Sequence, residues 1–284
     1  MPVPTMPVPL PDTMPSFVCA AWGWREYEMP AYFDAAVALG LPLVELNAHP
    51  QAPKHLSHEP DLAALPAVRR WAADAGASLL CVAGRNDFAT ADPAARREHL
   101  RNAHWFIDAA AELGAPFVRL LSGGHRDDAP DDATFSRLHA AFNEVGAHAE
   151  QAGVAVVIEN HGGPTATGQR VARLMAGIES PAVGLNYDPA NFLNQGADPL
   201  MALRWTRQWV RYSHWKDVRW GCGGPAFCAF GDGEIQWRPI LDLLLGTGYR
   251  GYFGIEYEEP QDVRAGTERS LANLRALLAE VLPG

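Results

Sequence analysis

The stretch Gln151-Ala-Gly-Val-Ala-Val-Val-Ile-Glu-Asn-His-Gly-Gly163 decides the fold of this chain. A glycine ends an amphipathic segment, and an apolar, largely β-branched run follows it. Glycine ends a helix at low cost because it adopts the left-handed conformation easily. The stretch therefore predicts a helix, a buried strand and a polar strand end. A buried carboxylate is tolerated only when it is paired or bound to metal, so Glu159 marks a candidate site.

The same order of helix, glycine and apolar strand recurs along the chain, before strands preceded by Gly40, Gly76, Gly114 and Gly248. Helices that alternate with short buried strands indicate a parallel sheet. Strands are expected near residues 16–21, 41–47, 78–84, 116–122, 154–160, 183–188, 210–215 and 252–257. Eight strand-helix units favour an α/β fold, a single-domain (β/α)8 TIM barrel. A doubly wound open sheet is the alternative, but no Gly-x-Gly-x-x-Gly turn follows the first strand.

The domain organisation predicted for the 284 residues is simple. Residues 1–14 are rich in proline and are expected to form a flexible tail, and residues 15–284 are expected to form the barrel domain. No apolar run reaches the ~18–20 residues of a membrane span, and the N-terminus lacks the basic and apolar segments of a secretory signal. We therefore expect a cytoplasmic protein with no membrane partner.

Charge and cysteine content exclude two further classes. The formal net charge is −10, which argues against a nucleic-acid partner, because such binding depends on clustered Lys and Arg. The four cysteines, Cys19, Cys81, Cys222 and Cys228, are too scattered for a disulfide framework or a zinc knuckle.

Two long loops are expected at the carboxyl end of the barrel. Residues 218–236 are expected to form a loop of the kind that covers active sites. Residues 47–60 contain His49, His55 and His58. Solvated polar residues are the favoured interpretation of these histidines, and a metal site is the alternative.

Four consecutive predicted strands end in residues that can bind a cation. They are Glu159, Asp188, His214 and Glu256. Active sites of TIM barrels lie at the carboxyl ends of the strands. Oxygen ligands with one imidazole suit a single Mn²⁺, Mg²⁺ or Co²⁺ ion, and Zn²⁺ is compatible.

Each of these residues also has a structural interpretation. Glu159 is a candidate ion-pair partner for Lys216 or Arg119. Asp188 is placed to cap the turn that follows it, and His214 is of a type often found as a satisfied core residue.

Glu258 shares strand parity with Glu256, so either is a candidate for the inward-facing ligand. Glu256 is favoured because it lies closer to the strand.

Five motifs carry a resemblance to a known family: Val157-Ile-Glu-Asn160, Tyr187-Asp-Pro-Ala-Asn191, His214-Trp-Lys-Asp217, Gly231-Asp-Gly-Glu-Ile-Gln-Trp237 and Gly248-Tyr-Arg-Gly-Tyr-Phe-Gly-Ile-Glu256. With these motifs the chain resembles the xylose isomerase-like TIM barrels, the sugar phosphate isomerase/epimerase group. In that family the corresponding Glu, Asp, His and Glu bind one divalent metal. The resemblance implies this role for Glu159, Asp188, His214 and Glu256, and a homodimer or homotetramer. It also implies that the two glutamates form the catalytic, proton-transferring pair.

The chain departs from the family pattern at Asn191. The apurinic endonucleases of the same superfamily have a His there and an Asp-x-His after strand seven, where this chain has Gly231-Asp232-Gly233. A trinuclear zinc nuclease is therefore disfavoured. Many ketose epimerases also resemble the His pattern at this position, and their His contacts the substrate, so an atypical substrate is expected.

The predicted function is isomerisation or epimerisation of a sugar or sugar derivative. Glu159 and Glu256 would remove and return the proton next to a carbonyl through an enediolate. Residues expected to contact the substrate are His161, Lys216, Asn191 and Trp22. A lyase that dehydrates a keto-inositol or keto-sugar with the same metal site is the alternative, and a non-catalytic small-molecule binder is a third hypothesis.

Overall fold

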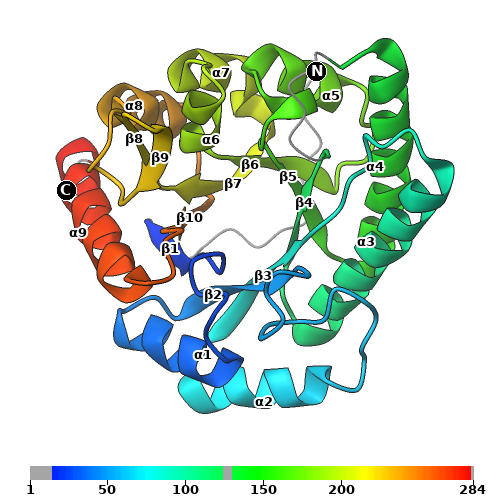
Figure 1. The fold of residues 1–284 in the computed structure, drawn as a ribbon, viewed down its shortest axis with the longest axis horizontal. Coiled ribbons are helices and arrows are strands. Elements are labelled where there is room, and N and C mark those ends of the chain that lie inside the picture. Colours follow the sequence, from blue (N-terminus) through cyan, green and yellow to red (C-terminus); the bar gives the residue numbers. More distant parts are fainter. Residues whose placement is uncertain (1–14, 124–129, 283–284) are drawn as a thin grey trace.

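The computed structural model describes residues 15–123 and 130–282 and shows a closed barrel of parallel strands inside a ring of helices (Figure 1). The barrel strands are β1 (Ser16–Cys19), β2 (Leu43–Ala48), β3 (Ser78–Gly84), β4 (Phe117–Leu121), β5 (Ala155–Glu159), β6 (Val183–Tyr187), β7 (Val210–Trp215) and β10 (Tyr252–Ile255). Their order around the barrel is β1-β10-β7-β6-β5-β4-β3-β2. The predicted (β/α)8 barrel is confirmed, and the open-sheet alternative is wrong. The predicted tail, residues 1–14, lies outside the described residues.

The helices of the outer ring follow the strands in chain order. They are α1 (Met29–Ala38), α2 (Leu65–Ala75), α3 (Pro93–Leu113), α4 (Asp132–Ala152), α5 (Gly168–Ala176), α6 (Pro189–Asn194), α7 (Pro199–Thr206), α8 (Trp237–Gly246) and α9 (Val263–Val281), with short 3-10 turns η1 (Gly163–Thr165) and η2 (Arg207–Trp209). The helices α2, α3 and α4 end at Gly76, Gly114 and Gly153, whose φ angles are +74°, +73° and +70°. The recurring glycines therefore do stop helices in the left-handed conformation. None of the helices in the described part of the chain combines the length and apolar character that a membrane crossing requires.

Side chains that alternate in direction along the strands form two cores, one between the barrel and the helices and one inside the barrel. On β5, Val156 and Ile158 pack against the helices, whereas Ala155 and Val157 face the barrel interior. The interior residues belong to a small apolar cluster with Val18, Leu43, Leu80, Cys81, Phe117, Tyr212 and Tyr252. This apolar layer lies one step before Glu159 on β5, because side chains two residues apart face the same way. The polar groups of the site therefore stand on an apolar floor.

The predicted loop at residues 218–236 is partly regular. It contains an antiparallel hairpin of β8 (Asp217–Gly221) and β9 (Gly224–Cys228), beside α8 in Figure 1. The hairpin was not predicted, because its short strands lack the apolar alternation by which strands are recognised. The buried carboxylate of Asp217 ties the segment down: it accepts hydrogen bonds from Trp237 Nε1 (2.7 Å), Gly231 N (3.2 Å) and Ile235 N (3.2 Å).

Gly84, at the end of β3, gives a test of how closely helix α3 packs on the barrel strands. A Cβ added at Gly84 would overlap the ring of Phe106, which is fully buried on α3. Overpacking of this kind costs about 1–3 kcal/mol, so Gly84→Ala should lower the free energy of unfolding by that amount in urea denaturation. Gly221→Ala is the matched control, because nothing lies within 4 Å of its added Cβ. Equal losses in both variants would contradict the close contact.

Candidate metal and substrate site

The carboxyl ends of β5, β6, β7 and β10 bring four predicted residues together. Each of Glu159, Asp188, His214 and Glu256 has one potential ligand atom within 4.8 Å of those of the other three. All four are buried, none more than 4% exposed. The barrel register explains the convergence, since neighbouring parallel strands end at one rim. Gly254 contributes space, because a Cβ there would lie 2.8 Å from the imidazole of His214.

His214 lies between carboxylates. Its Nδ1 is 3.0 Å from Glu159 Oε1 and 3.3 Å from Glu256 Oε2. Its Nε2 is 3.0 Å from Glu45 Oε1. Burial by itself lowers the pKa of His214, but the charges of Glu256, Glu45 and Glu159 outweigh it and raise this pKa well above its ordinary value. In the metal-free protein the ring therefore carries a proton on both nitrogens at neutral pH.

The ion pairs answer the question of Glu159's partner. Arg119 is that partner, with its Nε 3.3 Å from Glu159 Oε2. Lys216 instead contacts three other carboxylates: its Nζ lies 2.5 Å from Asp188 Oδ2, 2.9 Å from Glu258 Oε1, and in contact with Glu256 Oε2. Burial raises the pKa of Glu159, but Arg119 and His214 outweigh it and lower that pKa to about 2. Glu159 is therefore ionised at neutral pH.

Asp188 both caps helix α6 and belongs to the four-residue cluster. Its Oδ1 accepts the backbone N–H of Asn191 at 3.0 Å, which caps α6. Its Oδ2 contacts Lys216. Burial raises the pKa of Asp188 to about 6 although Lys216 lowers it. One carboxylate oxygen of Asp188 thus stabilises the start of α6, and the other belongs to the charged cluster of the site.

The donor set fits a divalent cation. Three buried carboxylates and one imidazole offer oxygen and nitrogen ligands of the kind that Mn²⁺, Co²⁺ and Zn²⁺ accept. The Nδ1 of His214 already faces two of the carboxylates. Its Nε2 is occupied by Glu45, an arrangement typical of imidazoles that bind metals.

Glu45 is the residue of this cluster that sequence analysis missed. It lies inside β2, is 1% exposed, and its Oε2 also accepts the N–H of Ala21 at 3.4 Å. The signal was present, because Leu43-Val-Glu-Leu46 contains one charge in an otherwise apolar strand.

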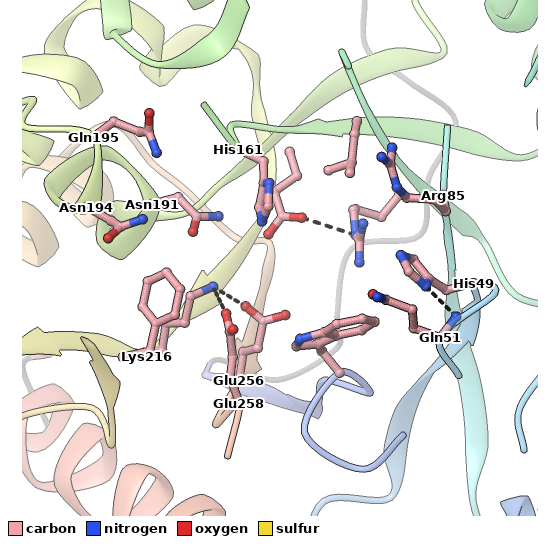
Figure 2. A pocket seen from close by; sticks show the side chains of 15 residues that line it. His49, Gln51, Arg85, His161, Asn191, Asn194, Gln195, Lys216, Glu256 and Glu258 are labelled. Atoms are coloured by element: carbon pink, nitrogen blue, oxygen red, sulfur yellow. Dashed lines mark hydrogen bonds and ion pairs between the residues drawn. The ribbon is translucent and has the colours of Figure 1, made fainter. Parts of the chain in front are cut away.

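A cavity of about 410 Å³ opens over the cluster, a size suited to a small molecule. Its lining includes all four predicted substrate contacts and both predicted catalytic residues: Trp22, His161, Lys216, Asn191, Glu159 and Glu256. Sequence analysis did not assign to it the other lining residues, which are His49, Gln51, Arg85, Arg119, Leu121, Asn194, Gln195, Phe227 and Glu258. Figure 2 shows Lys216 and the α6 amides on one side, and Arg85, His49 and Gln51 on the other.

Glu258 lines this cavity and contacts Lys216, but it is not in the four-residue cluster. The structure thus places Glu256, rather than Glu258, among the candidate ligands. Burial raises the pKa of Glu258 to about 7, and Lys216 opposes the rise.

The three histidines of residues 47–60 line a second cavity of about 360 Å³, but they form no metal-ligand group among the described residues. His49 also lines the cavity over the cluster. His55 is buried, with its Nε2 3.2 Å from the carbonyl oxygen of Trp24, and the Nδ1 of His58 lies 3.2 Å from that of Ala48. The expectation of solvated side chains is therefore wrong for His55, which packs inside the protein.

The fold and the site together define a (β/α)8 barrel with a buried carboxylate and imidazole cluster at its carboxyl rim. A model of the family described as xylose isomerase-like TIM barrel matches residues 33–277. The chain belongs to this family, as the sequence motifs indicated.

The chain is also similar to individual proteins. It is 25% identical over 265 residues to the inosose dehydratase of Lacticaseibacillus casei, which covers 84% of this chain and 87% of that protein. An L-ribulose 3-epimerase superposes with a TM-score of 0.78 at 18% identity, over 93% of this chain and 95% of that one. The zinc-containing IOLI protein superposes with a TM-score of 0.80 at 13% identity, over 95% and 100%. At these identities the two structures show the shared fold alone.

Glu45→Gln tests whether Glu45 supports the candidate metal ligand His214. Loss of a carboxylate behind a metal-binding imidazole costs about 10–100-fold in metal affinity. We expect a decrease of that size in Mn²⁺ affinity by isothermal titration calorimetry. Glu98→Gln, at an exposed position on α3, is the control. Equal affinities for the two variants would show that Glu45 does not support the ligand.

Proposed function

We propose that the protein is a metal-dependent enzyme that removes the proton next to a carbonyl in a sugar or sugar derivative. The observation that carries this proposal is the pair of buried glutamates, Glu159 and Glu256, which line the cavity and flank the same imidazole. Return of the proton would make the enzyme an isomerase or epimerase. A carbohydrate is the partner that we propose for the cavity.

The two glutamates are in the ionised state that a general base requires. The pKa of Glu256, like that of Glu159, is lowered: burial raises it, but His214 and Lys216 outweigh burial. Both carboxylates are therefore ionised and able to accept a proton at neutral pH. When bound by Glu159, Asp188, His214 and Glu256, a divalent ion would supply Lewis-acid stabilisation of negative charge developing on the substrate oxygens.

Lys216 and His161 are placed to stabilise the substrate. Burial lowers the pKa of Lys216, but Asp188, Glu256 and Glu258 raise it well above its ordinary value, so the ammonium group stays charged. Its position on the cavity wall suits donation to an enediolate oxygen. His161 lines the same cavity just after β5.

A lyase is the second candidate, and the similarity to an inosose dehydratase over most of both chains supports it. The same abstraction of a proton would then be followed by loss of a neighbouring hydroxyl group. Glu258, which lies 2.9 Å from Lys216 on the cavity wall and whose pKa burial raises to about 7, would protonate that leaving group.

Product analysis in deuterated water distinguishes the two candidates. Free ketoses, phosphorylated ketoses, keto-sugar acids and keto-inositols would be incubated with the Mn²⁺-loaded protein. An epimerase or isomerase returns a deuterated carbohydrate of the same composition, whereas a lyase releases a dehydrated product. Absence of both deuterium exchange and dehydration across the panel, with metal bound, would contradict the proposed function.

Glu159→Gln tests the ligand set. Replacement of a carboxylate by an amide removes one charged ligand from the cluster, so the metal content after loading and gel filtration should fall at least about tenfold. Elemental analysis measures it, with Glu98→Gln as the exposed control. Metal content equal to that of the control would exclude Glu159 as a ligand.

The protonation of His214 predicts how metal affinity depends on pH. Because the pKa of His214 is raised in the metal-free protein, an ion must displace a proton from this ring. Affinity for Mn²⁺ should therefore rise about tenfold per pH unit through the neutral range and fall in acid. Calorimetry in buffers of different ionisation enthalpy should detect release of about one proton per ion. Binding without proton release would contradict the role of His214.

A further inference from the structure

Two arginines occupy the cavity wall formed by neighbouring strands β3 and β4. Arg119 lies on β4 in register with Ala83 of β3, and Arg85 follows Ala83 by two residues. Residues two apart along a strand face the same side, so Arg85 lies one layer above Arg119. Both line the cavity, and Figure 2 shows Arg85 on the side away from Lys216.

Arg85 has no carboxylate partner in the described part of the chain. The hydrogen bond assigned to it there joins its Nη1 to the neighbouring carbonyl oxygen of Asn86, at 2.6 Å. The side chain is half-buried. A guanidinium group offers several donors in a planar fork that matches an oxyanion. Such a group on a cavity wall, without a carboxylate partner among the described residues, suits an anion of the ligand.

Arg119 has only one carboxylate at ion-pair distance among the described residues, Glu159. Although its Nε lies 3.3 Å from Glu159 Oε2, that nitrogen is buried without an aligned hydrogen bond to a described residue. Among residues 15–123 and 130–282, the two guanidinium groups on this wall thus have a single carboxylate at ion-pair distance, Glu159, which also belongs to the candidate metal cluster.

The pKa of the neighbouring His49 reflects the positive electrostatic potential of this wall. Burial lowers its pKa to about 4, and the charges of Arg119 and Arg85 contribute to the decrease. His49 is therefore neutral at neutral pH, and the charge of the wall comes from the two arginines.

The opposite wall has different chemistry. The carboxamides of Asn191, Asn194 and Gln195, from α6 and its end, line the cavity there. The Nδ2 of Asn191 is buried and has no hydrogen-bond partner among the described residues. Carboxamides both donate and accept, so they suit the hydroxyl groups of a polyol.

We propose that the substrate is a polyhydroxylated carbonyl compound that also carries a carboxylate or phosphate group, bound by Arg85 and Arg119. Its hydroxyl groups face the amides of α6, and its oxyanion faces β3 and β4. The inference rests on the proposed function for the position of the reacting carbons, but the anion site itself depends on the arginines alone. It separates this protein from enzymes whose substrates are uncharged polyol ketones.

The test compares the binding of matched probes by isothermal titration calorimetry. D-glucuronate and D-glucose differ by a carboxylate in place of a hydroxymethyl group, and D-glucose 6-phosphate presents a phosphate. We expect the anionic probes to bind at least about tenfold more tightly than glucose, because charge-assisted bonds to a guanidinium group exceed neutral ones. The tighter of the two anions identifies the oxyanion.

Variants of Arg85 test whether the preference for anionic probes comes from the arginine wall of the cavity. Arg85→Gln should abolish most of the preference, and Arg85→Lys should retain part of it, because lysine keeps the charge but not the fork. Arg101→Gln, exposed on α3, is the control and should keep the full preference. Circular dichroism checks that each variant is folded.

The outcomes separate this inference from the proposed function. In chelator-treated protein the anion preference should persist, because it does not need the ion. Persistence of the preference without α-proton exchange would contradict the proposed function alone. Equal binding of the charged and neutral probes, binding of neither at millimolar concentration, or a preference unchanged in Arg85→Gln would overturn the anion site.

Discussion

The site depends on how His214 is held by carboxylates on both ring nitrogens. Glu45 contacts Nε2, and Glu159 and Glu256 contact Nδ1, each within 3.3 Å. A buried imidazole among three carboxylates is stable only if it is protonated or if it binds a metal cation. Protonation meets this requirement in the metal-free protein, and a divalent ion at Nδ1 would meet it in the loaded protein. Lys216 and Arg119 balance part of the remaining negative charge.

The barrel holds His214 among the carboxylates because its interior side chains form layers, an apolar one below and a charged one above. Apolar side chains such as Phe117 and Tyr212 fill the interior below the site, so the charged groups are excluded from that end. Two residues further along the same strands come Arg119 and His214, and the cavity opens above them. The strands that present the carboxylate cluster, β10, β7, β6 and β5, are neighbours around the barrel, and the strands β4 and β3 beside the arginines follow them in order. Figure 2 shows Lys216 and Glu256 on one side of the cavity and Arg85 on the other. One cavity thus combines a carboxylate-rich side with a cationic side.

Much of this could be predicted from the sequence, because strand ends and helix stops are local features. Glycines such as Gly153 ended helices as expected, and Glu159 came from a strand whose apolar run was clear. Glu45 was missed because it lies within a strand rather than at its end. Arg85 gains meaning only from the closed barrel, which brings β3 opposite the metal side. The hairpin that begins at Asp217 was missed because its short strands, buried at Asp217 and Val218 but at least partly exposed beyond them, lack alternation.

Anomalous diffraction from crystals grown with Mn²⁺ would test the central claim directly. A single anomalous peak between the carboxylates of Glu159, Asp188 and Glu256, in contact with Nδ1 of His214, is the predicted result. With that ion bound, Nε2 should remain paired with Glu45. A peak elsewhere on the protein with none in this cluster, at saturating Mn²⁺ and neutral pH, would contradict a metal site formed by these four residues.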